Sequence, residues 1–358
     1  MLHEARFSQP LPGGEVLCTL CPHDCHIGEG ARGACGVRYV EGGKLYTLVY
    51  DRLIARVLEP IEKKPLYHFH PGSQAYSIST VGCNLRCSFC QNWDTSQWPK
   101  EHLPKKLSAA ASHIVCPQLA ELERTVPGEL VTPAQIVAAA RRSGAASIAY
   151  TFTEPVIFYE LCYDTALLAR RQGLKNVFHT NGFIGEAAQR EIAPLLDAVN
   201  VDLKFFRPES YLHISRARLE PILAAIRRYH EMKIWLEVTT LVIPGVNDSD
   251  EELRGIAAFL ASLGPEIPWH VSQFFPAYRM LDKPVTPEAT LLRAAGIGRA
   301  AGLRHVYIGN VPGSSGENTN CPKCAAPVIE RYGHHVRANR LVNACCPGCG
   351  TRIDGVGL

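Results

Sequence analysis

Three cysteines lie within eight residues of each other. Cys83, Cys87 and Cys90 form a C-x3-C-x2-C triplet with the aromatic Phe89 just before the third thiol. Thiolates are soft ligands that select zinc, copper(I) or iron–sulfur clusters. A structural zinc site takes four ligands, so zinc here would need a fourth from elsewhere in the chain. Three thiolates can instead hold a [4Fe–4S] cluster with one iron free to bind a further molecule.

A second group of cysteines lies near the N-terminus. Cys18, Cys21, Cys25 and Cys35 have the spacing C-x2-C-x3-C-x9-C. Four thiols at such spacing are most simply a structural zinc site. An auxiliary iron–sulfur cluster is the alternative, because it too takes four thiolates.

The third group lies near the C-terminus. Cys321 and Cys324 form one C-x2-C pair, and Cys346 and Cys349 form another. Two such pairs at this separation are typical of a zinc ribbon. Cys345 adjoins the second pair but breaks its spacing, so we expect it to take no part in the site.

Composition limits the function classes. The 358 residues carry 37 Lys and Arg against 34 Asp and Glu, a net charge of +3. This balance gives no argument for nucleic acid or an anionic membrane as partner. The 14 cysteines fall mostly in short-spaced groups, which indicates metal binding in a reducing cytoplasm. We find no signal peptide and no apolar run long enough to cross a membrane.

Strand and helix patterns alternate along the middle of the chain. Strands are predicted at 75–80, 146–152, 175–180, 199–204, 234–243, 269–275 and 305–309. Helices are predicted at 132–143, 186–194, 219–232 and 249–262, with one ending near residue 171 and one beginning at 286–287. This alternation predicts parallel strands with right-handed crossovers. A full barrel and a doubly wound sheet are alternatives to the predicted fold, a partial (β/α) barrel of the TIM type.

The cysteine triplet with Phe89 resembles the signature of radical S-adenosylmethionine (SAM) enzymes. The resemblance implies that a [4Fe–4S] cluster on Cys83, Cys87 and Cys90 binds SAM. One electron then cleaves SAM to methionine and a 5′-deoxyadenosyl radical, which takes a hydrogen atom from the substrate. In such enzymes the cofactor carries the chemistry and the protein supplies position and exclusion of water.

Further segments resemble one branch of this family. They include 20–25, 60–69, 82–93, 152–155, 180–182, 201–204, 241–248, 269–272, 306–310 and the C-terminal ribbon. Together they are similar to the relatives of the pyruvate formate-lyase activating enzyme, and among these to the radical SAM enzyme of the AmmeMemoRadiSam system. We expect an N-terminal Cys-rich module and connector at 1–72, a radical SAM barrel at 73–312 and a ribbon at 313–358. Residues 99–130 form an insertion in the barrel, which we expect to be a lid, a partner surface or a spacer.

Polar residues follow the predicted strands, where barrel enzymes build their active sites. Glu154 and Asp202 are expected to balance the positive charges of SAM, and Lys204 to bind its carboxylate. Asn181 and Glu237 are expected to bind its ribose, and His270 and Phe89 complete the predicted cofactor site. Locally, Asp202 and Lys204 could instead be a structural ion pair, and Asn181 with Gly182 a simple turn.

These features predict a radical SAM enzyme of unidentified substrate. The AmmeMemoRadiSam resemblance implies Memo-like and AMMECR-like partner proteins and a low-potential donor of the flavodoxin or ferredoxin type. One alternative is an activase that takes hydrogen from a glycine of a partner enzyme. The other is a non-catalytic zinc-binding interaction module, although no basic surface with interleaved aromatics favours nucleic acid.

Overall fold

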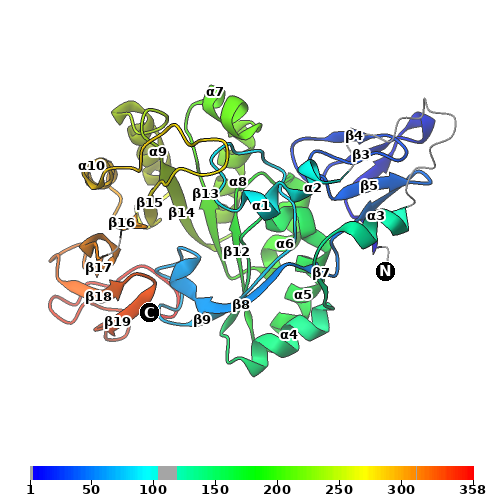
Figure 1. Cartoon of the computed structure of the whole chain (residues 1–358). Helices are drawn as coiled ribbons and strands as arrows, with labels where there is room; N and C mark the ends of the chain where they lie inside the picture. Colours follow the sequence, from blue (N-terminus) through cyan, green and yellow to red (C-terminus); the bar gives the residue numbers. More distant parts are fainter. Residues whose placement is uncertain (1–2, 104–118, 312) are drawn as a thin grey trace.

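A computed structural model describes residues 3–103, 119–311 and 313–358 (Figure 1). Its centre is an eight-stranded sheet with the order β16-β15-β14-β13-β12-β11-β9-β8. The strands are β8 (Ala55–Pro60), β9 (Gln74–Ser79), β11 (Ser147–Tyr150), β12 (Lys175–Thr180), β13 (Ala198–Asp202), β14 (Trp235–Val242), β15 (Trp269–Gln273) and β16 (Val306–Gly309).

The order of the strands distinguishes between the predicted folds. All neighbours from β9 to β16 are parallel, and β8 pairs antiparallel with β9. A doubly wound sheet reverses its strand order at a switch point, whereas this order follows the chain without reversal. The parallel α/β fold is therefore confirmed. Within the described ranges β8 and β16 do not pair, so the sheet stays open at that side.

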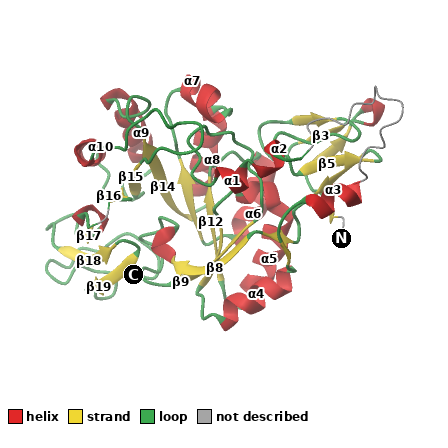
Figure 2. Ribbon diagram, viewed as in Figure 1, coloured by secondary structure: helices red, strands yellow, loops and turns green. Residues whose placement is uncertain are grey.

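Helices connect the parallel strands and surround the sheet (Figure 2). They are α4 (Pro133–Arg142), α5 (Tyr159–Arg171), α6 (Glu186–Ile192), α8 (Leu219–Glu231), α9 (Asp250–Leu263) and α10 (Glu288–Ala300). A complete capping box of Thr132 and Gln135 begins α4. The Ser249 side chain caps α9, and the carboxylate of Glu252 accepts the Phe206 N–H.

The segment 61–72, which we call the connector, lies against the inner face of the sheet. It begins with the short helix η2 (Ile61–Lys63). Apolar connector side chains pack against small residues of four neighbouring strands; the cluster comprises Ile61, Leu66, Phe69, Ala75, Ala149, Val177 and Ala198. Small side chains on the strands leave room that the connector fills. The connector is therefore a buried part of the domain.

The N-terminal module contains two three-stranded sheets. One has the order β1-β6-β5 and the other β2-β3-β4. The strands are β1 (His3–Glu4), β2 (Ser8–Pro10), β3 (Val16–Cys18), β4 (Cys25–Ile27), β5 (Arg38–Glu41) and β6 (Lys44–Thr47), with the short helix η1 (Pro12–Gly14). Its apolar residues belong to the same core as the central sheet. A buried ion pair of Arg38 with Glu160 also joins the two.

The C-terminal ribbon has a core of its own. It consists of η6 (Ser315–Glu317), β17 (Thr319–Asn320), β18 (Pro327–Tyr332) and β19 (His335–Asn339). Cys321 and Cys346 are buried in its apolar cluster. Buried Arg331 fixes the ribbon to the connector, because its guanidinium donates to the Tyr67 carbonyl at 2.7 Å and lies 4.3 Å from the Tyr67 ring centre.

The insertion predicted at 99–130 is described in part. It contains the end of α2 (Trp98–Glu101), then α3 (Leu119–Thr125) and β10 (Glu129–Leu130), which pairs with β7 (Arg52–Leu53). Residues 104–118 of the insertion lie outside the described residues. Across the part of the chain that the structure describes, no helix is long and apolar enough to cross a membrane.

Candidate active site

The cysteine triplet lies on the loop that leaves β9, at the carboxyl end of the parallel strands. Gly82 opens the loop with a φ of +107°. A Cβ there would lie 2.9 Å from Val37 Cγ1 of the N-terminal module, so only glycine fits. The loop is also held by backbone N–H groups of Arg86 and Ser88, which donate to the Ser215 and Ile214 carbonyls. Both sides of the loop are thus fixed by neighbouring elements.

Each thiol of the triplet has a polar group beside it. The Leu85 N–H donates to Cys83 Sγ at 3.3 Å. Cys87 Sγ lies 3.1 Å from the hydroxyl of Ser215, at the end of the π-helix η5 (Tyr211–Ser215), and Cys90 Sγ lies 3.2 Å from the Ser96 hydroxyl of α1 (Trp93–Ser96). Donors of this kind stabilise thiolates and set the potential of a cluster that they hold.

The triplet fits a cluster better than a single ion. Among the described residues, the ribbon cysteines form a set of four thiols that all lie within 4.8 Å of one another, and the three thiols of the triplet do not form such a set. Burial raises the pKa of the Cys83 and Cys87 thiols, and the cations Lys100 and Lys204 lower it. Three spaced thiols with N–H and O–H donors and two nearby cations match the requirements of an anionic [4Fe–4S] cluster.

Asp202 and Lys204 lie together at the end of β13. Lys204 Nζ donates to Asp202 Oδ2 at 2.7 Å, and His179 Nε2 lies 3.2 Å from Asp202 Oδ1. Burial alone would raise the pKa of Asp202, but Lys204 and His179 bring it below its usual value. Lys204 lies 6.0 Å from the centre of the Phe89 ring, which packs edge-on against Phe205. The predicted residues Phe89, Asp202 and Lys204 are therefore brought together beside the triplet.

These side chains are accessible from the carboxyl end of the strands. The His179 and Asp202 side chains are 25% and 28% exposed, and that of Lys204 is 14% exposed. A molecule bound over the triplet can therefore reach them without any change of fold. Because a lysine held by an aspartate keeps its charge, Lys204 is suited to bind a carboxylate.

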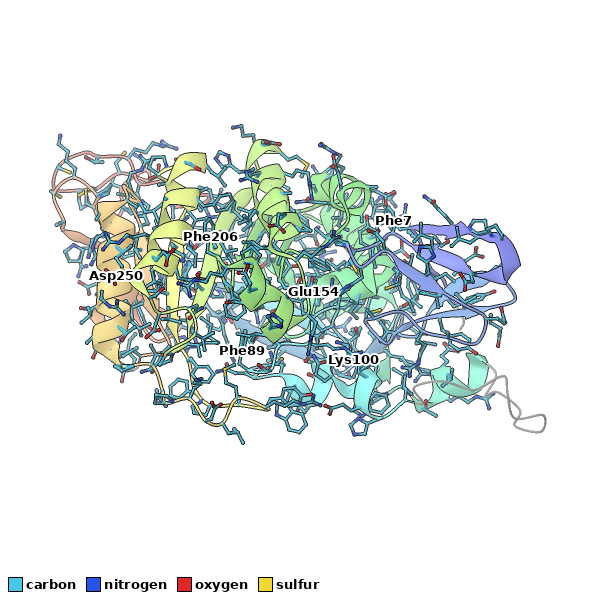
Figure 3. The ribbon with its side chains drawn as sticks, turned by 90° about the horizontal axis from the view of Figure 1, so that it is seen from above. Phe7, Phe89, Lys100, Glu154, Phe206 and Asp250 are labelled. Carbon is cyan, nitrogen blue, oxygen red and sulfur yellow. The ribbon has the colours of Figure 1, made fainter. Side chains whose placement is uncertain are left out.

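Glu154 is fully buried, and Figure 3 shows it amid other side chains near the middle of the molecule. Its Oε1 accepts the Thr180 hydroxyl at 2.6 Å and the Val156 N–H, and its Oε2 accepts the Asn181 N–H at 2.8 Å. Burial raises the pKa of Glu154 to about 7. The carboxylate thus joins the ends of β11 and β12, and it has no exposed surface with which to meet a SAM ammonium.

Asn181 connects the end of β12 to the triplet loop. Its amide nitrogen donates to Asn84 Oδ1 at 2.9 Å and lies 3.7 Å from Cys83 Sγ, and its amide oxygen accepts the Phe183 N–H. With both ends of the amide engaged, Asn181 positions Cys83. The predicted ribose contact would require those bonds to break.

Glu237 and His270 are held by the connector. The Glu237 carboxylate is fully buried and accepts the N–H groups of Tyr67 and His68, at 3.0 and 2.8 Å. It also accepts Trp235 Nε1, and His270 Nε2 lies 2.7 Å from Oε2. Both side chains thus help to hold the connector inside the sheet, and the expected contact of this pair with SAM stays a prediction.

The ribbon cysteines form a compact group that could hold a metal ion. The Sγ atoms of Cys321, Cys324, Cys346 and Cys349 all lie within 4.8 Å of one another, and Cys345 is outside the group. The pKa of the Cys349 thiol is lowered to about 6 by hydrogen bonds from Thr351. Four thiols this close suit one tetrahedral ion, and zinc is the ion that we predict.

Two residues near the triplet were not predicted as site residues. Lys100 is partly buried in α2, and its Nζ donates to the Leu85 carbonyl within the triplet loop at 2.5 Å. Burial lowers the pKa of Lys100, whereas Cys83, Cys35 and Cys87 raise it. His179 orients Asp202. Lys100 comes from a polar stretch that resembles exposed surface, so no local pattern indicates its contact with the triplet loop.

A shallow cavity of about 400 Å³ lies next to the triplet loop. It is lined by residues from three parts of the chain, which include Gln91, Phe275, Asn310, Glu317, Tyr332 and His334. Gln91 directly follows Cys90. The volume is within the range of small-molecule sites.

Fold and site together define a β/α protein that carries a three-thiolate centre at the mouth of its parallel strands. The family model "Radical SAM superfamily" matches residues 77–257, about half of the chain. This chain belongs to the radical SAM superfamily, which implies an enzyme with a [4Fe–4S] cluster and SAM.

Three similar proteins cover different parts of the chain. An uncharacterized protein of Methanocaldococcus jannaschii is 39% identical over 356 residues, 99% of each chain. The pyruvate formate-lyase-activating enzyme of Clostridium pasteurianum is 24% identical over 51% of this chain and 67% of its own. The crystal structure of a radical SAM methyltransferase from Sphaerobacter thermophilus is 19% identical over 68% of each chain, with a TM-score of 0.47.

Proposed function

We propose that this protein cleaves SAM reductively and uses the resulting radical to take a hydrogen atom from a substrate. The observation that carries the proposal is the position of Cys83, Cys87 and Cys90 beside the accessible pair Asp202 and Lys204. When bound, the cluster supplies the electron that breaks the S–C5′ bond of SAM and gives methionine and a 5′-deoxyadenosyl radical.

The chain's own residues would bind and orient the reactants. Lys204 is placed to bind the SAM carboxylate, and Asp202 keeps that lysine charged and oriented. His179 holds the other oxygen of Asp202. The connector fills the inner face below, so water is excluded from that side of the reacting atoms.

The substrate that we propose is a small molecule or a modification site presented by the AmmeMemoRadiSam system. Memo-like and AMMECR-like proteins would be its partners and a flavodoxin- or ferredoxin-type protein its electron donor. The filled inner face supports this assignment. His68 of the connector lies within hydrogen-bonding distance of Tyr307 on β16, and Phe69 pairs with Val356, so the open side of the sheet is occupied. Substrate must then enter from the carboxyl ends of the strands.

A glycyl-radical activase is the second candidate. The similarity to the pyruvate formate-lyase-activating enzyme of Clostridium pasteurianum favours it. An activase must admit a glycine loop of a folded protein, which needs more room than a small molecule. The occupied side of the sheet leaves only the mouth for such a loop.

The test is formation of 5′-deoxyadenosine by anaerobically reconstituted enzyme with SAM and dithionite, beside a Cys87→Ala variant. Product from the wild type alone supports the proposal. A wild-type enzyme with an intact cluster and no product would contradict it.

To separate the two candidate functions, the enzyme is then incubated with a purified glycyl-radical enzyme, and the glycyl radical signal is measured by electron paramagnetic resonance (EPR). A glycyl radical would favour the activase.

A further inference from the structure

The three groups of cysteines differ in how closely their sulfurs approach. Four thiolates at 2.3 Å from one zinc are about 3.8 Å apart, because the geometry is tetrahedral. The ribbon matches this value, with Cys321 and Cys349 at 3.5 Å and Cys324 and Cys346 at 3.7 Å. In the ranges that the structure describes, neither the triplet nor the N-terminal group forms a set of three or more ligand atoms that all lie within 4.8 Å of one another. Neither group is therefore packed as tightly as the ribbon thiols.

The N-terminal thiols nevertheless converge on one place. Cys18 and Cys25 are direct cross-strand partners in the β3–β4 pair, and Cys21 lies in the turn that joins these strands. Cys35 is electrostatically coupled to both Cys21 and Cys25. Cys18 and Cys35 are buried, and Cys21 and Cys25 are partly buried. Four convergent thiols suit a cluster in which each binds a different iron.

Each N-terminal thiol also has a hydrogen-bond donor. Arg38 Nη1 lies 3.9 Å from Cys18 Sγ, and the Ala34 N–H donates to Cys25 Sγ at 3.4 Å. The backbone of His23 hydrogen-bonds to the Cys21 thiol, and the backbone of Val37 hydrogen-bonds to the Cys35 thiol. Hydrogen bonds to the sulfurs are one of the means by which proteins hold clusters and tune their potentials.

The N-terminal group is adjacent to the triplet. The Cys35 carbonyl lies 3.5 Å from the Cβ position of Gly82, the residue before Cys83. His23 Nε2 lies 2.8 Å from the Asn84 carbonyl, which is also in the triplet loop. The two groups of thiols are therefore separated by little more than one layer of backbone.

Lys100 lies between the two groups. Seen from above, it lies between Phe89 and the blue N-terminal module (Figure 3). Its charge interacts with Cys35 on one side and with Cys83 and Cys87 on the other. A partly buried lysine without a carboxylate partner is costly, and an anionic centre on each side would stabilise it.

We propose that Cys18, Cys21, Cys25 and Cys35 hold a second [4Fe–4S] cluster, which passes electrons past Lys100 to the cluster on the triplet. All four irons of this cluster have a cysteine ligand, so it binds no SAM and serves electron transfer alone. The relay rests on the proposed function, whereas the presence of the second cluster does not.

The electron balance is simple. A reduced flavodoxin- or ferredoxin-type donor gives one electron to the N-terminal cluster, which goes from the 2+ to the 1+ state. That cluster returns to 2+ when the same electron moves to the triplet's cluster. No bond forms or breaks and no proton moves in either step.

Metal content of a variant without the triplet tests the second cluster. The Cys83→Ala/Cys87→Ala/Cys90→Ala variant is purified anaerobically from iron-supplemented cells, beside wild type and a Cys162→Ala control. Cys162 is buried in α5 and belongs to none of the three groups. We expect about eight irons per wild-type or control chain and about four in the triple variant, each with one zinc in the ribbon. The triple variant should keep an EPR signal on reduction.

A triple variant with two zinc ions and no iron would overturn the proposal. Because removal of three thiols could disturb folding, the wild-type spectrum gives a second measurement. We expect two reduced signals, of which SAM alters only one. A single signal, altered completely by SAM, would likewise contradict the second cluster. Neither result depends on the formation of 5′-deoxyadenosine, and measuring that product tests the proposed function separately.

Lys100→Met tests the position of the lysine between the clusters. Loss of a positive charge makes an anionic cluster harder to reduce, so both midpoint potentials should become more negative. Lys44→Met, at an exposed ion pair with Glu4, is the matched control and should change neither. A shift of the triplet's potential alone would show that no second centre lies on the other side of Lys100.

Discussion

Lys204 donates from Nζ to Oδ2 of Asp202 at 2.7 Å, two residues away where β13 ends. The pair is partly exposed, and the lysine also interacts with Cys87. A partly exposed ion pair contributes little net stability, so a structural role alone does not account for its position. At the mouth of the strands the pair is instead placed to hold a cation where a cofactor carboxylate can meet it.

Lys204→Met should weaken SAM binding by about tenfold or more, because a charge-assisted hydrogen bond is lost. The measurement is the SAM dissociation constant of the reconstituted enzyme, with iron content determined in parallel. Lys175→Met is the matched control, since Lys175 pairs with Asp197 at 2.9 Å and lies at the start of β12. Unchanged SAM affinity with full iron would leave Asp202 and Lys204 as a structural pair.

Ser215→Ala should make the potential of the triplet's cluster more negative. The Ser215 hydroxyl lies 3.1 Å from Cys87 Sγ, and a donor to a ligating thiolate favours the reduced, more negative cluster. An EPR-monitored redox titration measures the shift. Ser143→Ala, which removes a hydroxyl bonded to the Ala140 carbonyl of α4, serves as control. Equal potentials in wild type and Ser215→Ala would mean that the hydroxyl does not bond to the thiolate.

The stability of the protein should depend on pH through Glu154. Its folded-state pKa of about 7 exceeds the ordinary value of 4.5, so its contribution is fully present below pH 4.5 and is lost as the pH rises through 7. A shift of this size corresponds to about 3 kcal/mol. Relative to Glu154→Gln, the wild type should therefore lose free energy of unfolding between these pH values.

Denaturant unfolding at several pH values measures this difference. Glu186→Gln, an exposed glutamate on α6 paired with Arg190, is the control and should follow the wild type. Parallel pH profiles for wild type and Glu154→Gln would show that the Glu154 carboxyl titrates normally.

Glu237→Gln should lower the free energy of unfolding by about 2 kcal/mol, because a buried acceptor of several N–H groups loses charge and one oxygen. SAM affinity should stay at the wild-type value, since Glu237 and His270 bind the connector and each other. Chemical denaturation and a SAM titration of the same variant measure both. Glu129→Gln, at an exposed ion pair with Arg56, is the control. Weaker SAM binding at unchanged stability would support the sequence-based assignment.

Part of the site could be predicted from the sequence, because the residues that form it are close together along the chain. The spacing of Cys83, Cys87 and Cys90 lies within one loop, and Asp202 and Lys204 follow a strand with a clear apolar pattern. Strand and helix positions agree closely because both periodicities are strong here. β13, for example, was predicted at 199–204 and spans Ala198–Asp202.

The surroundings of the other site residues could not be predicted, because they depend on contacts between segments that are distant in the sequence. Glu237 was placed at the mouth because it is a polar residue in an apolar strand, but the connector, about 170 residues earlier, supplies its partners. Glu154 was expected to meet SAM, yet the Thr180 hydroxyl and the Asn181 N–H enclose it. In the same way, nothing local to Lys100 indicates that it contacts the triplet loop.

Removal of zinc from the ribbon should loosen the connector as well as the ribbon itself. The four ribbon thiols are close enough for one ion, and without it they would repel one another as they ionise. Arg331 donates from the ribbon to the Tyr67 carbonyl, and the adjoining N–H groups of Tyr67 and His68 bind Glu237. Hydrogen exchange in the connector should therefore increase after chelation, together with exchange in β18 and β19.

Arg331→Met separates the effect of losing the metal from the effect of losing the bond between ribbon and connector. This variant keeps the zinc thiols but loses the bond from the ribbon to the connector, so connector exchange should increase while ribbon exchange changes little. Arg337→Met, which removes a surface cation from β19, is the control. If chelation increased exchange in the ribbon alone, the ribbon would be an independent appendage. If both segments respond, the metal at Cys321, Cys324, Cys346 and Cys349 helps to close the open side of the sheet, because the connector fills that side only while the ribbon holds it.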